Sequence, residues 1–333
     1  MSNTHHCESG IFQSACLPIK PARIVPDLID DVREGLLEPP RSLPPKYFYD
    51  KKGSQLFTEI CSTPEYYPTR TEDNLLAHHG INIIEAVKPD QILELGSGNS
   101  LKTRRLFDAC EKAEHACSYA PFDVCAPMLE ITSEQLQSDY DWLQVTPLLG
   151  DYHAGLSNLP AIKGSRLFVF LGSTIGNFAP EEARDFLAEI RSSMCPGDYL
   201  LLGADRVKDS TILSAAYNDA KGVTSEFNLN LLNVLNRELD ADFKINYFRH
   251  DARYNERHSR IEMRLVCIKD QVVSLRRLNE TISFRAGDEI LTEVSHKYTF
   301  ESVEKLLHGS GFDISRHYQP ENRFFSLILA QHA

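Results

Sequence analysis

Between residues 90 and 205 the sequence alternates short apolar runs with helical segments, and this pattern constrains the fold more than any other feature. Strands that follow one another through helices run parallel, with helices on both faces of the sheet. We therefore predict a doubly wound α/β domain. The expected strands lie at 91–95, 118–122, 144–149, 167–171 and 198–203, and the expected helices lie at 100–113, 126–138 and 180–193.

The pattern changes after this region. Residues 209–238 are predicted to be helical, and residues 243–297 alternate polar and apolar positions with period two, as antiparallel strands do. A helix at about 299–310 then precedes two closing strands. The chain thus returns to its first type of structure after a β-rich interruption.

Before residue 90, an amphipathic helix is predicted at about 26–36, and two further helices follow because Pro64 and Pro68 prevent one continuous helix. Together these patterns predict two domains and a tail. The tail comprises residues 1–20, the substrate-binding α+β domain comprises 21–70 and 208–297, and the parallel-sheet domain comprises 71–207 and 298–333.

Charge and cysteine usage narrow the function class. A net charge of -12 disfavours broad contact with nucleic acid, and no apolar run approaches the roughly 20 residues of a membrane helix. The N-terminus does not resemble a signal peptide, and the eight cysteines show neither CxxC nor zinc-site spacing. We expect a cytoplasmic monomer with reduced thiols and no metal, which acts on a small molecule.

The string "ILELGSGNS" places a glycine turn directly after a buried strand. A phosphate-binding P-loop is excluded because the second glycine of GxxxxGK[ST] is missing, and a dinucleotide turn is disfavoured because Leu101 replaces the third glycine of GxGxxG. The remaining pattern, E-x-G-x-G with Glu94, Gly96 and Gly98, is typical of the cofactor turn of S-adenosylmethionine-dependent methyltransferases. A tight turn that binds no ligand remains the alternative.

Acidic residues also end the next two strands. Asp123 follows the second strand at the position where a carboxylate accepts both ribose hydroxyls in dinucleotide folds, and Asp151 follows Gly150 after the third, where an acceptor meets an adenine amino group. Each Asp singly is also explained as a helix N-cap. Their shared sheet edge favours a nucleoside site. The predicted cofactor-binding residues are Glu94, Gly96, Ser97, Gly98, Lys102, Asp123, Gly150 and Asp151.

Over residues 30–333 the sequence resembles the L-histidine Nα-methyltransferases, which form hercynine in ergothioneine biosynthesis. The resemblance rests on "SLPPKYFYDKKGSQLF", "PEYYPTRTE", "ELGSGNSLKTR", "PFDV", "FLGSTIGNF", "LLLGADRVKD", "NLLNVLNREL" and "LTEVSHKY". It implies a class I, Rossmann-like S-adenosylmethionine fold with a separate substrate domain.

The resemblance also implies roles for individual residues. Tyr66 and Asn177 would hold the amino acid, with Tyr49 nearby as the catalytic residue, and Tyr217 would bind the carboxylate together with Asn177. Glu293 and Ser295 would bind the imidazole, and Met263 would pack beside it. His296 receives no role.

These residue types suit methyl transfer, which demands alignment more than acid–base chemistry. Tyrosine faces tolerate a growing quaternary ammonium through cation–π contact, and a carboxylate at Glu293 would select imidazole through a charge-assisted hydrogen bond. Three alternatives stay open: methylation of another aromatic amino acid such as tryptophan, a non-catalytic binding protein of the same fold, and a nicotinamide dehydrogenase, which Leu101 disfavours.

Overall fold

The predicted parallel sheet is present in the computed structural model, which describes residues 16–332. Its neighbours pair in parallel from β1 to β8, and the two C-terminal strands add an antiparallel edge. In spatial order the strands are β1 (Leu17–Pro18), β6 (Leu148–Leu149), β4 (Ser118–Asp123), β3 (Gln91–Leu95), β7 (Arg166–Phe170), β8 (Tyr199–Asp205), β15 (Phe325–His332) and β14 (Phe312–Tyr318), while β5 (Gln144–Val145) also pairs with β4.

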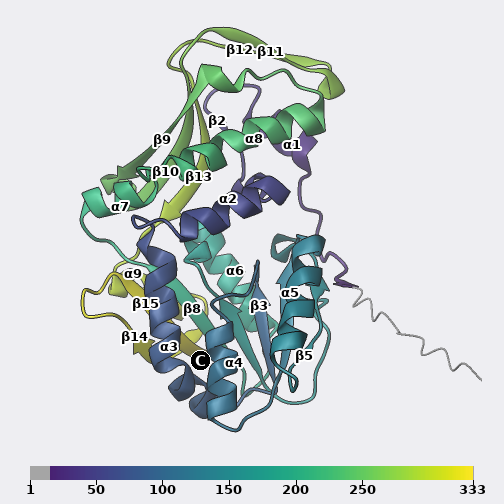
Figure 1. Ribbon diagram of the computed structural model, residues 1–333, viewed down its shortest axis with the longest axis vertical. Helices are drawn as coiled ribbons and strands as arrows, with labels where there is room; N and C mark the ends of the chain where they lie inside the picture. Colours follow the sequence, from purple (N-terminus) through teal and green to yellow (C-terminus); the bar gives the residue numbers. More distant parts are fainter. Residues whose placement is uncertain (1–15, 333) are drawn as a thin grey trace, which may run out of the picture.

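Helices cover both faces of this sheet, and each face has its own core (Figure 1). Ile92 and Leu93 show the division, since these neighbours on β3 are both fully buried but belong to opposite cores. This explains why the strands are continuous apolar runs. One face packs against α3 (Tyr67–Val87), α4 (Arg104–Lys112) and α5 (Ala126–Asp139), and the other packs against α6 (Pro180–Ser192) and α9 (Phe300–Gly309).

A smaller sheet with its own helices forms the second lobe, above the large sheet in Figure 1. Its strands are β2 (Arg41–Ser42), β13 (Glu289–His296), β10 (Arg260–Cys267) and β9 (Phe248–Asn255), beside a ribbon of β11 (Gln271–Leu275) and β12 (Glu280–Phe284). Its helices are α1 (Leu28–Gly35), α2 (Lys51–Cys61), α7 (Ser210–Ala216) and α8 (Val223–Leu239). Short 3-10 helices complete the chain: η1 (Pro45–Phe48), η2 (Tyr152–Ala154), η3 (Thr174–Asn177), η4 (Ile245–Tyr247), η5 (Glu256–His258) and η6 (Arg276–Leu278).

A third core lies in this second lobe and draws its buried residues from the segments 32–67 and 213–290. The cores therefore fall within the two predicted groups of segments, whereas the independent folding of each group as a domain stays a prediction. The lobes join where β8 ends, because the Lys297 ammonium, directly after β13, lies 3.0 Å from Asp205 Oδ2. No helix among residues 16–332 has the length and apolar character needed to cross a membrane.

The predicted tail ends too late. Residues 1–15 of it lie outside the described residues, but Leu17 and Pro18 form β1 and extend the large sheet. The following residues also pack on this lobe, since the Ala22 N–H donates to Ala154 O at 2.8 Å. The stretch after residue 21 therefore contacts the parallel-sheet lobe before the chain enters the second lobe.

Two predicted elements are interrupted. The strand at 144–149 is two short strands, because Pro147 has no N–H to donate to a ladder. The helix at 209–238 is divided into α7 and α8, because the Asp219 carboxylate caps a new helix by accepting from the N–H groups of Val223 and Thr224. Tyr217 lies in the break between α7 and α8 and lines the candidate site described below.

Candidate active site

A cavity of about 1830 Å³ lies between the carboxyl edge of the large sheet and the second lobe. It brings together residues that are far apart in the sequence and come from both lobes. The predicted residues that line it are Tyr49, Tyr66, Glu94, Gly96, Ser97, Gly98, Lys102, Asp123, Asp151, Asn177, Tyr217, Glu293 and Ser295.

The glycine turn after β3 presents bare backbone to this cavity. Gly96 and Gly98 have φ of 70° and 51°, a region that favours glycine, and a side chain built on Gly98 would meet no atom within 4 Å. Between them, the buried Ser97 hydroxyl has no hydrogen-bond partner among the described residues. An open backbone and an unpartnered polar atom fit the amino-acid end of S-adenosylmethionine.

Glu94 holds the base of this turn. Its carboxylate accepts from the Tyr119 hydroxyl, which also lies 2.7 Å from the Ser100 hydroxyl on the far side of the turn. Burial raises the pKa of Glu94 to about 7, although the hydrogen bond from Tyr119 opposes this shift. Glu94 therefore both lines the cavity and fixes the shape of the turn.

Asp123 and Asp151 both line the cavity and both accept hydrogen bonds from backbone N–H groups, and their contact with a nucleoside stays a prediction. Asp123 accepts from the Gly98 N–H at 2.9 Å and from the Cys125 N–H at 3.0 Å, so that it supports the turn and the start of α5 while lining the cavity. Asp151 accepts from the backbone and ring nitrogens of His153, both at 2.8 Å. Burial raises the pKa of Asp151, but the contacts with His153 outweigh it and lower this pKa overall.

Lys102 is held by a residue that the sequence did not single out. The fully buried Glu72 on α3 forms an ion pair with Lys102 and accepts from the Gly172 N–H at 2.9 Å. Glu72 thus ties the segment between the glycine turn and α4 to the loop after β7. Its signal in the sequence is a charge on the apolar stripe of a helix, three and four residues before Leu75 and Leu76.

Tyrosines at helix ends form the aromatic wall. Tyr49 follows η1, Tyr66 precedes α3, and Tyr217 follows α7. The rings of Tyr66 and Tyr217 meet edge to face with centroids 6.0 Å apart, and Phe57 lies 5.7 Å from Tyr49 and 6.3 Å from Tyr66. The hydroxyls of Tyr49 and Tyr66 have no hydrogen-bond partner among residues 16–332.

Asn177 ends the 3-10 helix η3, which packs directly on strand β13 of the other lobe. A side chain at Gly176 would lie 2.6 Å from His296 O, so only glycine permits this approach. The Tyr298 hydroxyl also donates to Ile175 O at 3.2 Å. Within the described chain the Asn177 amide has no partner, and it faces the cavity beside the strand that carries Glu293.

Glu293 and Ser295 lie two residues apart on β13 and therefore point to the same face. The Glu293 carboxylate has no hydrogen-bond partner in the described part of the chain, and burial raises its pKa to about 7 although the Lys297 charge opposes this. A buried, unpartnered carboxylate is ready to accept an N–H from a ligand.

Two predicted residues do not reach the cavity wall. Gly150 faces the Phe122 ring and Ile19, because β1 packs against this side of β6. Met263 pairs with Glu293 across the β10–β13 ladder but is 1% exposed within the core of the second lobe. Met263 supports the strand from behind instead of contacting the ligand space.

Comparison with known proteins identifies relatives that match most of the chain. The sequence model of the family described as histidine-specific, SAM-dependent methyltransferases matches residues 28–332. Histidine N-alpha-methyltransferase from Mycobacterium tuberculosis is 45% identical over 300 residues, which are 90% of this chain and 93% of that protein.

More distant relatives act in fungi. Ergothioneine biosynthesis protein 1 from Neurospora crassa is 32% identical over 88% of this chain, which corresponds to 33% of that larger protein. A 4-dimethylallyltryptophan N-methyltransferase from Claviceps purpurea is 26% identical over 89% of this chain and 92% of its own length. Similar chains therefore include proteins named for different amino-acid substrates.

The substitution Gly176→Ala tests the contact between η3 and β13. The added methyl group would push Asn177 away from Glu293, so we expect histidine affinity to fall at least tenfold while affinity for S-adenosylhomocysteine changes less than threefold. Both affinities are measured by calorimetry. The matched control is Gly309→Ala on α9, where an added side chain meets no atom within 4 Å. Equal losses for the two ligands would contradict this role.

The raised pKa of Glu293 predicts a pH-dependent effect on stability. The folded protein holds this proton up to about pH 7, whereas the unfolded chain releases it near its ordinary pKa of 4.5, so the associated stability is lost as the pH rises through 7. Glu293→Gln removes this loss. It should raise the free energy of unfolding by about 2–3 kcal/mol at pH 8 and by much less at pH 5. Urea unfolding at both pH values measures this, and an equal effect at both would refute it.

Proposed function

The chain belongs to the family of histidine-specific, S-adenosylmethionine-dependent methyltransferases, and we propose that it trimethylates the α-amino group of L-histidine to hercynine, the first step of ergothioneine biosynthesis. The observation that carries the proposal is the cavity shared by the glycine turn, Asn177 and Glu293. The first element suits the methyl donor and the others suit an amino acid with an imidazole. S-Adenosylmethionine supplies a methyl group on a positively charged sulfur, whose carbon–sulfur bond breaks as the carbon–nitrogen bond forms.

The proposed reaction needs no strong base to activate the substrate. An α-amino group at a peptide terminus has a pKa of about 8, so its neutral form at pH 7 costs only about 1.4 kcal/mol, and the carboxylate of a free amino acid raises this cost moderately. The tyrosines of the cavity do not supply a base, since burial raises the pKa of Tyr49 and Tyr66 well above the usual value. The main contribution of the site is alignment, which can lower a barrier by roughly 7–11 kcal/mol.

In this proposal each side chain has a separate task. Asn177 and Tyr66 hold the amine and Tyr217 binds the carboxylate, while Tyr49 presents its ring to the cation that grows with each transfer. Glu293 accepts the imidazole N–H, and Ser295 bonds to the other ring nitrogen. The first two transfers each leave an ammonium that releases a proton to water, and the third leaves a quaternary nitrogen with no proton to lose.

Glu293 also favours histidine over tryptophan, which the relative from Claviceps purpurea raises as an alternative. An indole N–H would also meet the carboxylate, but the wider apolar ring leaves the Ser295 hydroxyl unpartnered. We further propose a cytoplasmic monomer, because one chain suffices to supply both the glycine turn and the amino-acid end of the cavity, and the seven described cysteines are free thiols.

Incubation with S-adenosylmethionine and a panel of amino acids, read by mass spectrometry, tests the reaction. Histidine should gain 14, 28 and 42 mass units in sequence, with the last product accumulating. If tryptophan gained mass instead, tryptophan would replace histidine as the proposed substrate. Accumulation of the first or second product would refute trimethylation. Calorimetry that detects neither S-adenosylhomocysteine nor histidine binding would favour a non-catalytic protein.

Glu293→Ala tests the assignment of specificity. It removes a charge-assisted hydrogen bond, so kcat/KM for histidine should fall about 10- to 100-fold, whereas affinity for S-adenosylhomocysteine should change less than threefold. Glu289→Ala is the matched control on the same strand, because its carboxylate pairs with Arg253 and Arg264 outside the cavity. A Glu293→Ala enzyme with unchanged histidine KM would contradict the role.

A further inference from the structure

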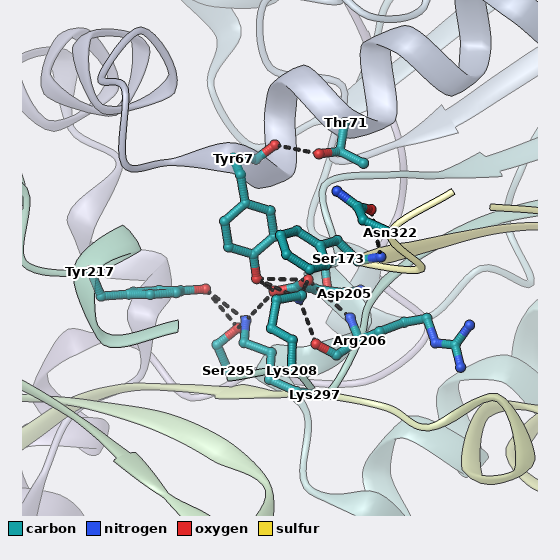
Figure 2. A network of polar contacts seen from close by, with 11 residues as sticks. Tyr67, Thr71, Ser173, Asp205, Arg206, Lys208, Tyr217, Ser295, Lys297 and Asn322 are labelled. Atoms are coloured by element: carbon teal, nitrogen blue, oxygen red, sulfur yellow. Dashed lines mark hydrogen bonds and ion pairs between the residues drawn. The ribbon is translucent and has the colours of Figure 1, made fainter. Parts of the chain in front are cut away.

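Behind the aromatic wall, the buried Lys297 ammonium has a partner for each of its three N–H groups. Its Nζ lies 3.0 Å from Asp205 Oδ2, 2.8 Å from Ser295 Oγ and 3.0 Å from the Tyr217 hydroxyl (Figure 2). Lys297 follows Ser295 by two residues at the end of β13, so the alternation of the strand brings both side chains to one face. In the string "EVSHK", the lysine two positions after a predicted site residue is the signal from which this contact could have been predicted.

The cluster around Lys297 carries more positive than negative charge. Burial alone would lower the pKa of Lys297, but Tyr217 and Asp205 raise it above its usual value, and the ammonium stays protonated. The same Asp205 carboxylate pairs with Lys208, and it accepts from the Tyr67 hydroxyl at 2.7 Å. Two ammonium groups thus share one carboxylate in a buried place, which leaves a net positive charge that favours a nearby anion.

Two hydroxyl groups, those of Tyr217 and Ser295, lie between the positively charged Lys297 and the cavity. Tyr217 and Ser295 line the cavity, while Lys297 and Asp205 lie behind them. An ammonium only donates, so each hydroxyl receives a hydrogen bond from Lys297 and keeps its own proton to donate. Tyr217 donates to Ser295 Oγ at 2.9 Å, and the Ser295 hydroxyl has no acceptor among residues 16–332. One of the two hydroxyl protons is shared within the pair, so the pair presents one remaining donor, backed by a positive charge, to whatever occupies the cavity.

We propose that Lys297 is a positioning residue that directs the remaining hydroxyl proton of the Tyr217–Ser295 pair toward the substrate and thereby selects an amino acid with a free carboxylate. This inference rests on the proposed function, and it assigns to Lys297 a task beyond joining the lobes. Asp205, at the end of β8, fixes the ammonium from the methyltransferase lobe. The carboxylate preference is then set by a residue that does not touch the substrate.

Lys297→Met tests this, with histidine and histidinamide as paired ligands in the presence of S-adenosylhomocysteine. Histidinamide lacks the carboxylate charge but keeps the amine and the imidazole. The wild-type protein should bind histidine at least tenfold more tightly than histidinamide by calorimetry. In Lys297→Met this ratio should fall at least tenfold, mainly through weaker histidine binding. If Lys297 had a purely structural role, its replacement would weaken the binding of both ligands equally, and the ratio of their affinities would not change.

Lys208→Met is the matched control, because it removes the other ammonium from Asp205 without touching Tyr217 or Ser295. Because it lowers the net charge but leaves the contacts of Lys297 with both hydroxyls in place, it should reduce the ratio less than threefold, and Lys297→Arg should retain part of the ratio that Lys297→Met loses. If Lys297→Met does not fold, Lys297→Gln, which keeps N–H donors without the charge, is used and should show the same loss. An unchanged ratio in the Lys297 variants, or the same loss in Lys208→Met, overturns the inference alone. A wild-type protein that binds S-adenosylhomocysteine but not histidine overturns the proposed function as well.

Discussion

The buried carboxylate of Asp205 is the constraint on which the site depends. It ends the central strand β8, accepts from Tyr67 at the start of α3, and binds the ammonium of Lys297 at the end of β13. One residue thus connects the large sheet, the helix that follows Tyr66, and the strand that carries Glu293. Removing two charges from water is unfavourable by several kcal/mol per ion, so such a cluster contributes definition of geometry more than stability. Geometry is what methyl transfer requires.

The polar groups around the cavity differ in whether they have hydrogen-bond partners within the protein. Asp123 and Glu72 accept from backbone N–H groups of the cofactor turn and its neighbouring loop, and so build the walls. Glu293 and Asn177 have no partner among the described residues. Unpaired polar groups reduce stability in the free protein, and they gain most when a ligand of the right shape arrives. The site therefore contains one group of residues that maintains its shape and a second group whose polar atoms are available to bind the substrate.

Local patterns in the sequence were sufficient for the large sheet and for most of the cavity. Buried parallel strands are continuous apolar runs, and the carboxyl ends of such strands meet at one edge, which brings Gly96, Asp123 and Asp151 together. The position of Gly150 outside the cavity could not be predicted, because the packing of Ile19 against it depends on a distant pairing of β1 with β6. The roles of Lys297 and Glu72 could not be predicted from local patterns. Each forms a buried ion pair with a residue that is distant in the sequence, Asp205 for Lys297 and Lys102 for Glu72.

The close approach at Gly176 has a mechanical consequence. Backbone of η3 lies against backbone of β13, and the Tyr298 hydroxyl holds Ile175 O beside it. Two backbones in contact cannot slide or part without losing that fit. The end of the cavity that carries Asn177 is therefore fixed by main-chain contact between the lobes, and its shape there does not depend on the rotamer of any long side chain.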